Sequence, residues 1–208
     1  EHNQLAVGGG GAFIGVLATQ THPHTHPDAT AQPALEAVVV RFAGDSGDGM
    51  QLTGGQFTLS TALAGNDLAT FPDFPAEIRA PQGTTFGVSA FQINFGSCAI
   101  ETAGDQPDVL VAMNPAALRA NLGDLKKGAT VIVDSHDFTT RNLNKAGYAE
   151  NPLETDALDE YAVHAFDLTD MTVEAVKEFG LSRKDAGRAK NMFALGLLSW
   201  MYGRPTEP

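Results

Sequence analysis

Short runs of apolar, often β-branched residues recur along the chain from residue 37 onward, and polar stretches separate them. Runs that are apolar throughout are typical of strands covered on both faces, as in a parallel sheet. The second run alternates instead and predicts a half-buried strand, with Ile93 facing inward and Gln92 and Asn94 facing outward. The five predicted strands span residues 37–43, 88–95, 109–113, 129–133 and 161–168.

The intervals between these strands predict helices. In residues 50–64, Leu52, Leu59 and Leu63 form one apolar stripe, and a following Gly-Asn pair is typical of a helix end. Strands that alternate with helices predict an α/β fold, namely a Rossmann-like three-layer sandwich with a mainly parallel sheet and helices on both faces. Further helices are expected over residues 116–122, 172–179 and 184–202.

Residues 1–36 differ in composition and are expected to form a flexible Gly/His/Pro-rich tail. A run of glycines and a stretch rich in Thr, His, Pro and Ala provide little apolar surface to bury. The alternating His22, His24 and His26 would share one side of an extended chain and could bind a metal. The prolines among them favour an open segment, so we assign no metal site.

Composition and charge narrow the class of protein. The 208-residue chain carries a formal net charge of −12, which argues against binding to nucleic acid or to an anionic membrane surface. Its single cysteine, Cys98, cannot supply the four thiolates of an iron–sulfur cluster. The apolar stretch near the N-terminus follows Glu1 and His2, so neither a signal peptide nor a membrane span is expected. A reducing cytoplasm is the expected location.

A glycine-rich loop follows the first predicted strand and precedes the first helix. Glycine permits the close approach of a ligand to backbone N–H groups, and a helix N-terminus favours an anion. The spacing G-x-x-G-x-G departs from the dinucleotide fingerprint, and no P-loop lysine follows. Two aspartates would repel a phosphate unless they point away, cap the helix or meet a cation, so a tight polar turn remains the alternative. The candidate ligand-facing residues are Gly44, Ser46, Gly47, Asp48 and Gly49.

A second loop, over residues 71–85, contains three prolines and an isolated Glu77 and Arg79. Because proline fixes φ and interrupts ladder pairing, this loop is expected to be a stiff excursion that presents both charges. Arg79 could bind a carboxylate or phosphate through two hydrogen bonds, or it could pair with Glu77. Asn114, expected to cap the helix that Pro115 begins, follows a strand end where α/β sheets place ligand crevices. No residue is assigned a catalytic role.

Four stretches of the chain are more specific as an ordered set than any one of them alone. They are RFAGDSGDGMQLTGGQF, FPAEIRAPQGTTFGVSAFQI, DVLVAMNPAAL and RAKNMFALGLLSWMYGR. Together they resemble the α subunit of 2-oxoacid:ferredoxin oxidoreductases, of the 2-oxoglutarate type with a γ domain fused at its N-terminus. The resemblance covers residues 37–204 and leaves out the tail.

The resemblance implies a complex that decarboxylates a 2-oxoacid on thiamine diphosphate, reduces ferredoxin through iron–sulfur chemistry and forms an acyl-CoA. It places thiamine diphosphate and Mg²⁺ chiefly on a β partner subunit, and it associates the γ domain with coenzyme A and with assembly. The two loops around residues 44–49 and 77–79 would face the active centre or a partner. Which 2-oxoacid is used stays open.

The resemblance also implies that part of the α subunit lies outside this sequence. The chain stops at Pro208, before the pyrimidine-side domain of such a subunit, so residues 205–208 are expected to begin a linker to its remainder. The chain is then a fragment of the α subunit or its γ domain alone. We expect it to bind no cofactor tightly by itself and to be inactive alone.

Two other functions stay open from the residues. A strand, glycine loop and helix are compatible with a free-standing Rossmann-like nucleotide-binding module, although the glycine spacing argues against it. The second alternative is a purely structural assembly domain, in which the apolar C-terminal helix docks onto a partner. That helix carries Met192, Phe193, Leu197 and Trp200 at helical spacing, a pattern that is also typical of a core helix.

Overall fold

A six-stranded sheet runs through the middle of the computed structural model, which describes residues 36–74 and 87–204. The strand order is β2-β3-β1-β4-β5-β6. Strands β1, β4, β5 and β6 are parallel, and β3 is antiparallel to both β1 and β2. The strands are β1 (Ala37–Asp45), β2 (Asp67–Asp73), β3 (Val88–Gly96), β4 (Val109–Ala112), β5 (Thr130–Asp134) and β6 (Ala162–Phe166).

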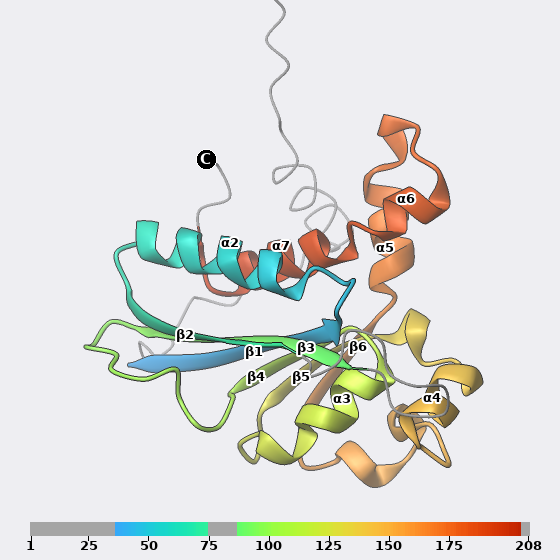
Figure 1. Ribbon diagram of the computed structural model, residues 1–208, viewed down its shortest axis with the longest axis horizontal. Coiled ribbons are helices and arrows are strands. Elements are labelled where there is room, and N and C mark those ends of the chain that lie inside the picture. The colour runs from blue at the N-terminus through green and yellow to red at the C-terminus, as the bar shows by residue number, and fades with distance from the viewer. Residues whose placement is uncertain (1–35, 75–86, 205–208) are drawn as a thin grey trace, which may run out of the picture.

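Helices cover both faces of this sheet (Figure 1). The helices α2 and α7 lie side by side over one face, and α3 and α4 lie together on the other. The predicted α/β sandwich of three layers is therefore confirmed. The helices are α2 (Met50–Leu63), α3 (Pro115–Asn121), α4 (Thr140–Ala146), α5 (Leu168–Ala175), α6 (Arg183–Gly187) and α7 (Lys190–Met201).

Strands β1 and β4 send their following helices to opposite faces of the sheet. β1 continues into α2 on one face, whereas its neighbour β4 continues into α3 on the other (Figure 1). In an open α/β sheet, the loops at such a switch point diverge and leave a crevice beyond the carboxyl ends of the two strands. The glycine-rich loop and Asn114 follow these two strands, so the fold brings these candidates together.

An aromatic cluster fills the space between the sheet and the layer formed by α2 and α7. Phe57 of α2 meets Phe42 of β1 and Phe95 of β3 edge-to-face, with ring centroids 5.8 and 5.5 Å apart. Phe193 of α7 belongs to the same cluster. A second core cluster, which includes Leu118 of α3, lies on the opposite face. Because both faces of β1 are covered in this way, its apolar run has no solvent side.

The strand β3 is more deeply buried than its alternating sequence predicts. It lies between β2 and β1, and the side chain of Gln92 is only 5% exposed. Gln92 Nε2 donates to the carbonyl of Ala103 at 2.8 Å, and Asn94 Nδ2 donates to the carbonyl of Thr102 at 2.9 Å. The prediction that Gln92 faces solvent is wrong, because the segment before β4 covers this face and supplies carbonyl acceptors.

One predicted helix needs correction, and two further elements were not predicted. The helix expected over residues 184–202 is two helices, since α6 ends at Gly187 and α7 begins at Lys190. Lys190, at the start of α7, reaches Asp134 in the sheet. The edge strand β2 and the short helix α4 were not predicted, because neither carries a clear apolar period.

Several predicted features lie outside the described residues. They are the tail with its histidine triplet, the loop that carries Glu77 and Arg79, and the linker residues 205–208. Among the helices that the structure describes, none combines the length and the apolar composition needed to cross a membrane.

Two adjacent glycines of α2 should respond in opposite directions to the same substitution. A Cβ at Gly54 would lie 2.1 Å from Cδ1 of Phe91 on β3, whereas a Cβ at Gly55 would meet no atom within 4 Å. We expect Gly54→Ala to lower the free energy of unfolding by about 1–3 kcal/mol through overpacking. Gly55→Ala should raise it by up to about 1 kcal/mol, because alanine favours the helix. Urea denaturation measures both, and equal effects would contradict the close contact of α2 with the sheet.

Candidate functional site

The glycine-rich loop after β1 is closed by one of its own carboxylates. The N–H of Asp48 donates to the carbonyl of Asp45 at 2.9 Å, and the N–H of Asp45 donates to Asp48 Oδ2 at 2.9 Å. This carboxylate lies against Gly44, where a Cβ would come within 2.8 Å of Oδ2. A side chain at position 44 would push this carboxylate aside, and Asp48 occupies a backbone N–H that an external anion would otherwise take.

Gly49 joins the same loop to α7. Its φ of 72° lies in the left-handed region, and a Cβ there would lie 2.5 Å from Nδ2 of Asn191. Glycine alone satisfies both constraints without strain or displacement of the neighbour. The other two candidates of the loop, Ser46 and Gly47, are exposed. The loop thus has one end packed against α7 and a tip that is open to solvent.

Asn114 holds the loop after β1 against the start of α3. Its Oδ1 accepts from the N–H of Ala117 at 2.8 Å, and its Nδ2 donates to Asp45 Oδ1 at 2.9 Å. The predicted helix cap, with Pro115 in the first turn, is confirmed. One side chain therefore fixes both walls of the crevice at the switch point.

One side of the crevice is acidic. A pocket of about 200 Å³ is lined by the carboxylates of Asp45, Asp48 and Asp137, together with Asn114 and Lys145. Burial raises the pKa of Asp45 and of Asp48 above their ordinary values. Because three aspartates and one lysine line this pocket, a phosphate bound there would meet a net negative charge. We call this side the acidic pocket.

The other side of the crevice is basic. A larger pocket, of about 600 Å³, lies between Gly47 of the loop and the segment that contains α6 and the start of α7. Four basic side chains line it, against the two carboxylates of Asp48 and Asp137. Basic side chains that line a concave site attract anions. We call this side the basic pocket; its basic residues are Arg183, Lys184, Arg188 and Lys190.

The cations of the basic pocket differ in how strongly the protein engages them. Arg183 pairs with Asp170, and Arg188 pairs with Asp185 at 3.3 Å, but both guanidinium groups are largely exposed. Lys184 is exposed and has no ion-pair partner among the residues that the structure describes. An anionic ligand therefore finds Lys184 and the open edges of two guanidinium groups on this side.

Lys190 is engaged with the sheet. Its Nζ lies 3.1 Å from Oδ2 of Asp134, a fully buried residue at the end of β5, and it also bonds to Asp137. Asp134 further accepts from the N–H of Leu168 and the hydroxyl of Thr169, both at 3.0 Å. Burial lowers the pKa of Lys190, but the bond to Asp137 and the charge of Asp134 outweigh it, so this pKa lies above its ordinary value. The pair ties β5, α5 and α7 together.

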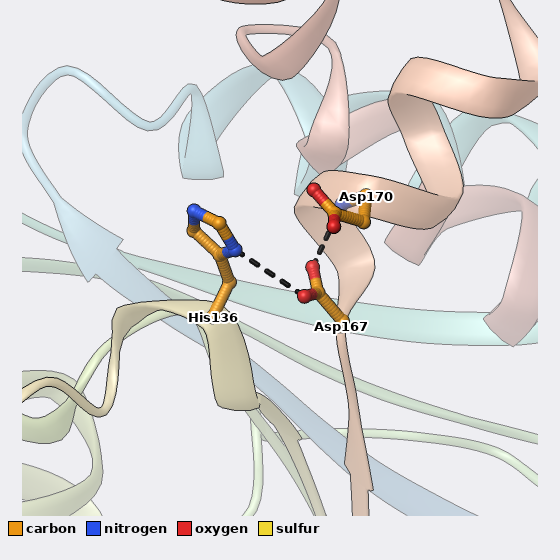
Figure 2. A group of neighbouring side chains, drawn as sticks. All are labelled: His136, Asp167 and Asp170. Carbon is orange, nitrogen blue, oxygen red and sulfur yellow. Dashed lines mark hydrogen bonds and ion pairs between the residues drawn. The ribbon is translucent and has the colours of Figure 1, made fainter.

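A histidine and two aspartates approach one another beside the basic pocket (Figure 2). His136 Nδ1 lies 3.3 Å from Asp167 Oδ2, and the potential ligand atoms of the three residues lie within 4.8 Å of one another. Asp167 also caps α5 by accepting from the N–H of Asp170 at 2.7 Å, and Asp170 pairs with Arg183. Because both carboxylates already have protein partners, the trio attaches α5 to the sheet and we assign it no metal.

The basic residues of the crevice and Asp134 were not predicted from the sequence. A compositional signal was present, since residues 183–190 hold four of the 13 lysines and arginines of a strongly acidic chain. This segment is far along the chain from the glycine-rich loop, and only the fold places the two on the same pocket. Asp134 ends a predicted strand, but nothing local indicates that a lysine near the C-terminus neutralises it.

These features define an α/β domain with a crevice at the topological switch point of its sheet, one side of which is acidic and the other basic. Residues 39–207 match the family model described as pyruvate ferredoxin/flavodoxin oxidoreductase. The chain therefore belongs to the pyruvate ferredoxin/flavodoxin oxidoreductase family. The resemblance to 2-oxoacid:ferredoxin oxidoreductases that the ordered motifs predict is confirmed.

Individual relatives agree with this family. The chain is 63% identical over 184 residues to the 2-oxoglutarate oxidoreductase subunit KorA of Mycobacterium tuberculosis, covering 88% of this chain and 28% of that subunit. It is 26% identical, with a TM-score of 0.58, to the 2-oxoglutarate:ferredoxin oxidoreductase of Magnetococcus marinus, solved with 2-oxoglutarate, coenzyme A and succinyl-CoA bound. That match covers 79% of this chain and 24% of the other, so this chain spans about a quarter of the length of both relatives.

A γ subunit shares the fold as a separate chain. The γ subunit of a keto/oxoacid ferredoxin oxidoreductase from Geobacter sulfurreducens has 19% identity and a TM-score of 0.55. The match covers 81% of this chain and 78% of that one. At this identity the likeness concerns the fold alone.

Removing the charge of Lys190 should destabilise the protein strongly. Lys190→Met leaves the buried carboxylate of Asp134 without its cation, and we expect the free energy of unfolding to fall by about 3–5 kcal/mol. The matched control is Lys177→Met, because Lys177 pairs with Glu174 at 3.2 Å in an exposed position, where the loss should stay below about 1 kcal/mol. Chemical denaturation at neutral pH measures both variants.

A second variant tests the cause of that loss. Adding Asp134→Asn to Lys190→Met removes the unpaired charge and should restore part of the stability. If Lys190→Met cost no more than Lys177→Met, the buried pair would not be the anchor of this part of the fold.

Proposed function

We propose that this chain is the γ-domain portion of a thiamine-diphosphate-dependent 2-oxoglutarate:ferredoxin oxidoreductase. The observation that carries the proposal is the 63% identity to a subunit named for 2-oxoglutarate, over 88% of this chain. The enzyme oxidises the 2-oxoacid with loss of carbon dioxide, transfers the acyl group to coenzyme A and passes the electrons to ferredoxin. We assign residues 37–204 to this domain and residues 205–208 to a linker toward the remainder of the α subunit.

Within that complex, we assign the phosphate groups of coenzyme A to the basic pocket. The Magnetococcus marinus relative was solved with coenzyme A bound, and phosphates are the charged part of that molecule. Arginine and lysine bind phosphate through charge-assisted hydrogen bonds, and Lys184, Arg183 and Arg188 present such donors at the open side of the pocket. The acidic pocket would repel the same groups. Ser46 and Gly47, at the exposed tip of the loop, then border the ligand.

The iron–sulfur cluster needs more thiolates than this chain contains. An iron–sulfur cluster is usually held by four thiolates, whereas this chain contains only Cys98. We assign thiamine diphosphate and Mg²⁺ to a β partner subunit; when bound there, they supply the chemistry that releases carbon dioxide. This domain then binds coenzyme A, helps to enclose the active centre and assembles with the β subunit and the remainder of the α subunit. A reducing cytoplasm suits these redox centres.

The coenzyme A assignment predicts a selective change in kinetics. In the complete enzyme, Lys184→Ala with Arg188→Ala should raise KM for coenzyme A at least about tenfold, because the loss of even one charge-assisted hydrogen bond of about 1.5 kcal/mol has this effect. KM for 2-oxoglutarate should not change. Lys177→Ala, at an exposed lysine outside the pocket, is the control. Steady-state rates at varied coenzyme A measure the effect, and an unchanged KM in the double variant would exclude this pocket as the site.

The isolated chain should have no turnover of its own. We expect neither ferredoxin nor a viologen dye to be reduced when the chain alone is given 2-oxoglutarate and coenzyme A. Addition of the remaining subunits should restore the reaction. Steady, 2-oxoglutarate-dependent reduction by the chain alone would refute the proposed division of labour.

A further inference from the structure

The outer surface of α2 carries a row of leucines that the domain itself does not bury. Leu52, Leu59 and Leu63 are 56%, 55% and 72% exposed, and they recur at the spacing of one helix face. We call these three residues the leucine stripe. The opposite face of α2 packs on the sheet through Met50, Phe57 and smaller residues. The predicted apolar stripe of this helix therefore exists, but it faces away from the core.

The layer that presents the leucine stripe is almost free of charge. No residue of α2 is charged, and the only charged residue of α7 is Lys190, which is directed to Asp134. Trp200, near the end of α7, is also largely exposed, at 62%. The other helices carry charges, both the neighbouring α5, with Asp170, and those on the other face of the sheet, for example Arg119 of α3. In a chain with a net charge of −12, two adjacent helices that expose apolar side chains and carry one lysine between them are typical of a contact surface.

The chemistry of this surface indicates what kind of partner covers it. Transient partners such as an electron carrier are generally steered by complementary charges, and this surface has none to offer. Surfaces that are permanently covered resemble a domain core and are depleted in charged residues. The leucine stripe therefore matches a permanent contact.

We infer that the remainder of the same subunit packs on the leucine stripe. More than two thirds of the polypeptide of the Mycobacterium tuberculosis relative lies outside the region of similarity, so a large part of one chain must be accommodated around a domain of this size. Its α2/α7 layer offers the permanent apolar contact that this requires. The inference shares one premise with the proposed function, namely that this chain is part of a longer subunit. It does not depend on coenzyme A binding.

Photo-crosslinking in the assembled complex tests this contact. A benzophenone amino acid at position 59 of the full-length subunit should crosslink, on irradiation, to segments of the same polypeptide outside residues 1–208. The matched control is the same probe at Phe179, which is 60% exposed and lies outside this layer. Mass spectrometry of the crosslinked peptides identifies what covers the stripe.

Hydrogen exchange gives a second, independent readout. Leu59→Glu should make the amides of α2 exchange about tenfold faster in the full-length subunit, because a charge in a permanent apolar contact loosens it. Phe179→Glu should leave α2 unchanged.

Each other outcome overturns the inference in a distinct way. Crosslinks from position 59 to a second copy or to another subunit would assign the surface to that partner, and no crosslinks above the Phe179 control would leave it uncovered. None of these readouts depends on turnover, so a failed coenzyme A assignment and a failed contact surface are distinguishable.

Discussion

The buried pair of Asp134 and Lys190 is the interaction on which the arrangement of the crevice depends. The carboxylate of Asp134 is removed from solvent at the end of β5, where an unpaired charge would be strongly unfavourable. Lys190 neutralises it, and the backbone of Leu168 and the hydroxyl of Thr169 complete its hydrogen bonds. Because these partners come from the starts of α5 and α7, one side chain positions two helices against the sheet.

The position of α7 in turn constrains the glycine-rich loop. Asn191 follows Lys190 and lies against Gly49. Because the pair of Lys190 with Asp134 holds the start of α7 in place, it also limits which residue can occupy position 49. Within the loop, Asp48 fills the space next to Gly44 and takes the N–H of Asp45. The loop has the glycines of an anion-binding turn, but the carboxylate of Asp48 already accepts from one of its backbone N–H groups. The basic side chains of the crevice lie instead on the segment around α6, which is where we place the phosphates of a ligand.

The two faces of helix α2 have different roles: one packs on the sheet and the other presents exposed leucines. Gly54 allows its inner face to approach Phe91 of the sheet closely, and Phe57 fills the aromatic core. Its outer face has leucines where a helix facing solvent would carry charged or polar residues. The domain is therefore built with a crevice at the carboxyl ends of its strands and an apolar layer on one face of its sheet.

Most of the strands and helices, although not β2, α4 or the break between α6 and α7, were determined by the sequence, as were the helix cap at Asn114 and the family, because they depend on local periodicity, capping chemistry and ordered motifs. The glycine-rich loop was also recognised locally, with its two aspartates as the obstacle to a phosphate. Only the tertiary structure decided which way amphipathic elements face: Gln92 is buried since a later segment covers it, and the stripe of α2 points outward. The same holds for the basic pocket and for Asp134 with Lys190, because their members are far apart in the chain and no local pattern encodes a long-range contact.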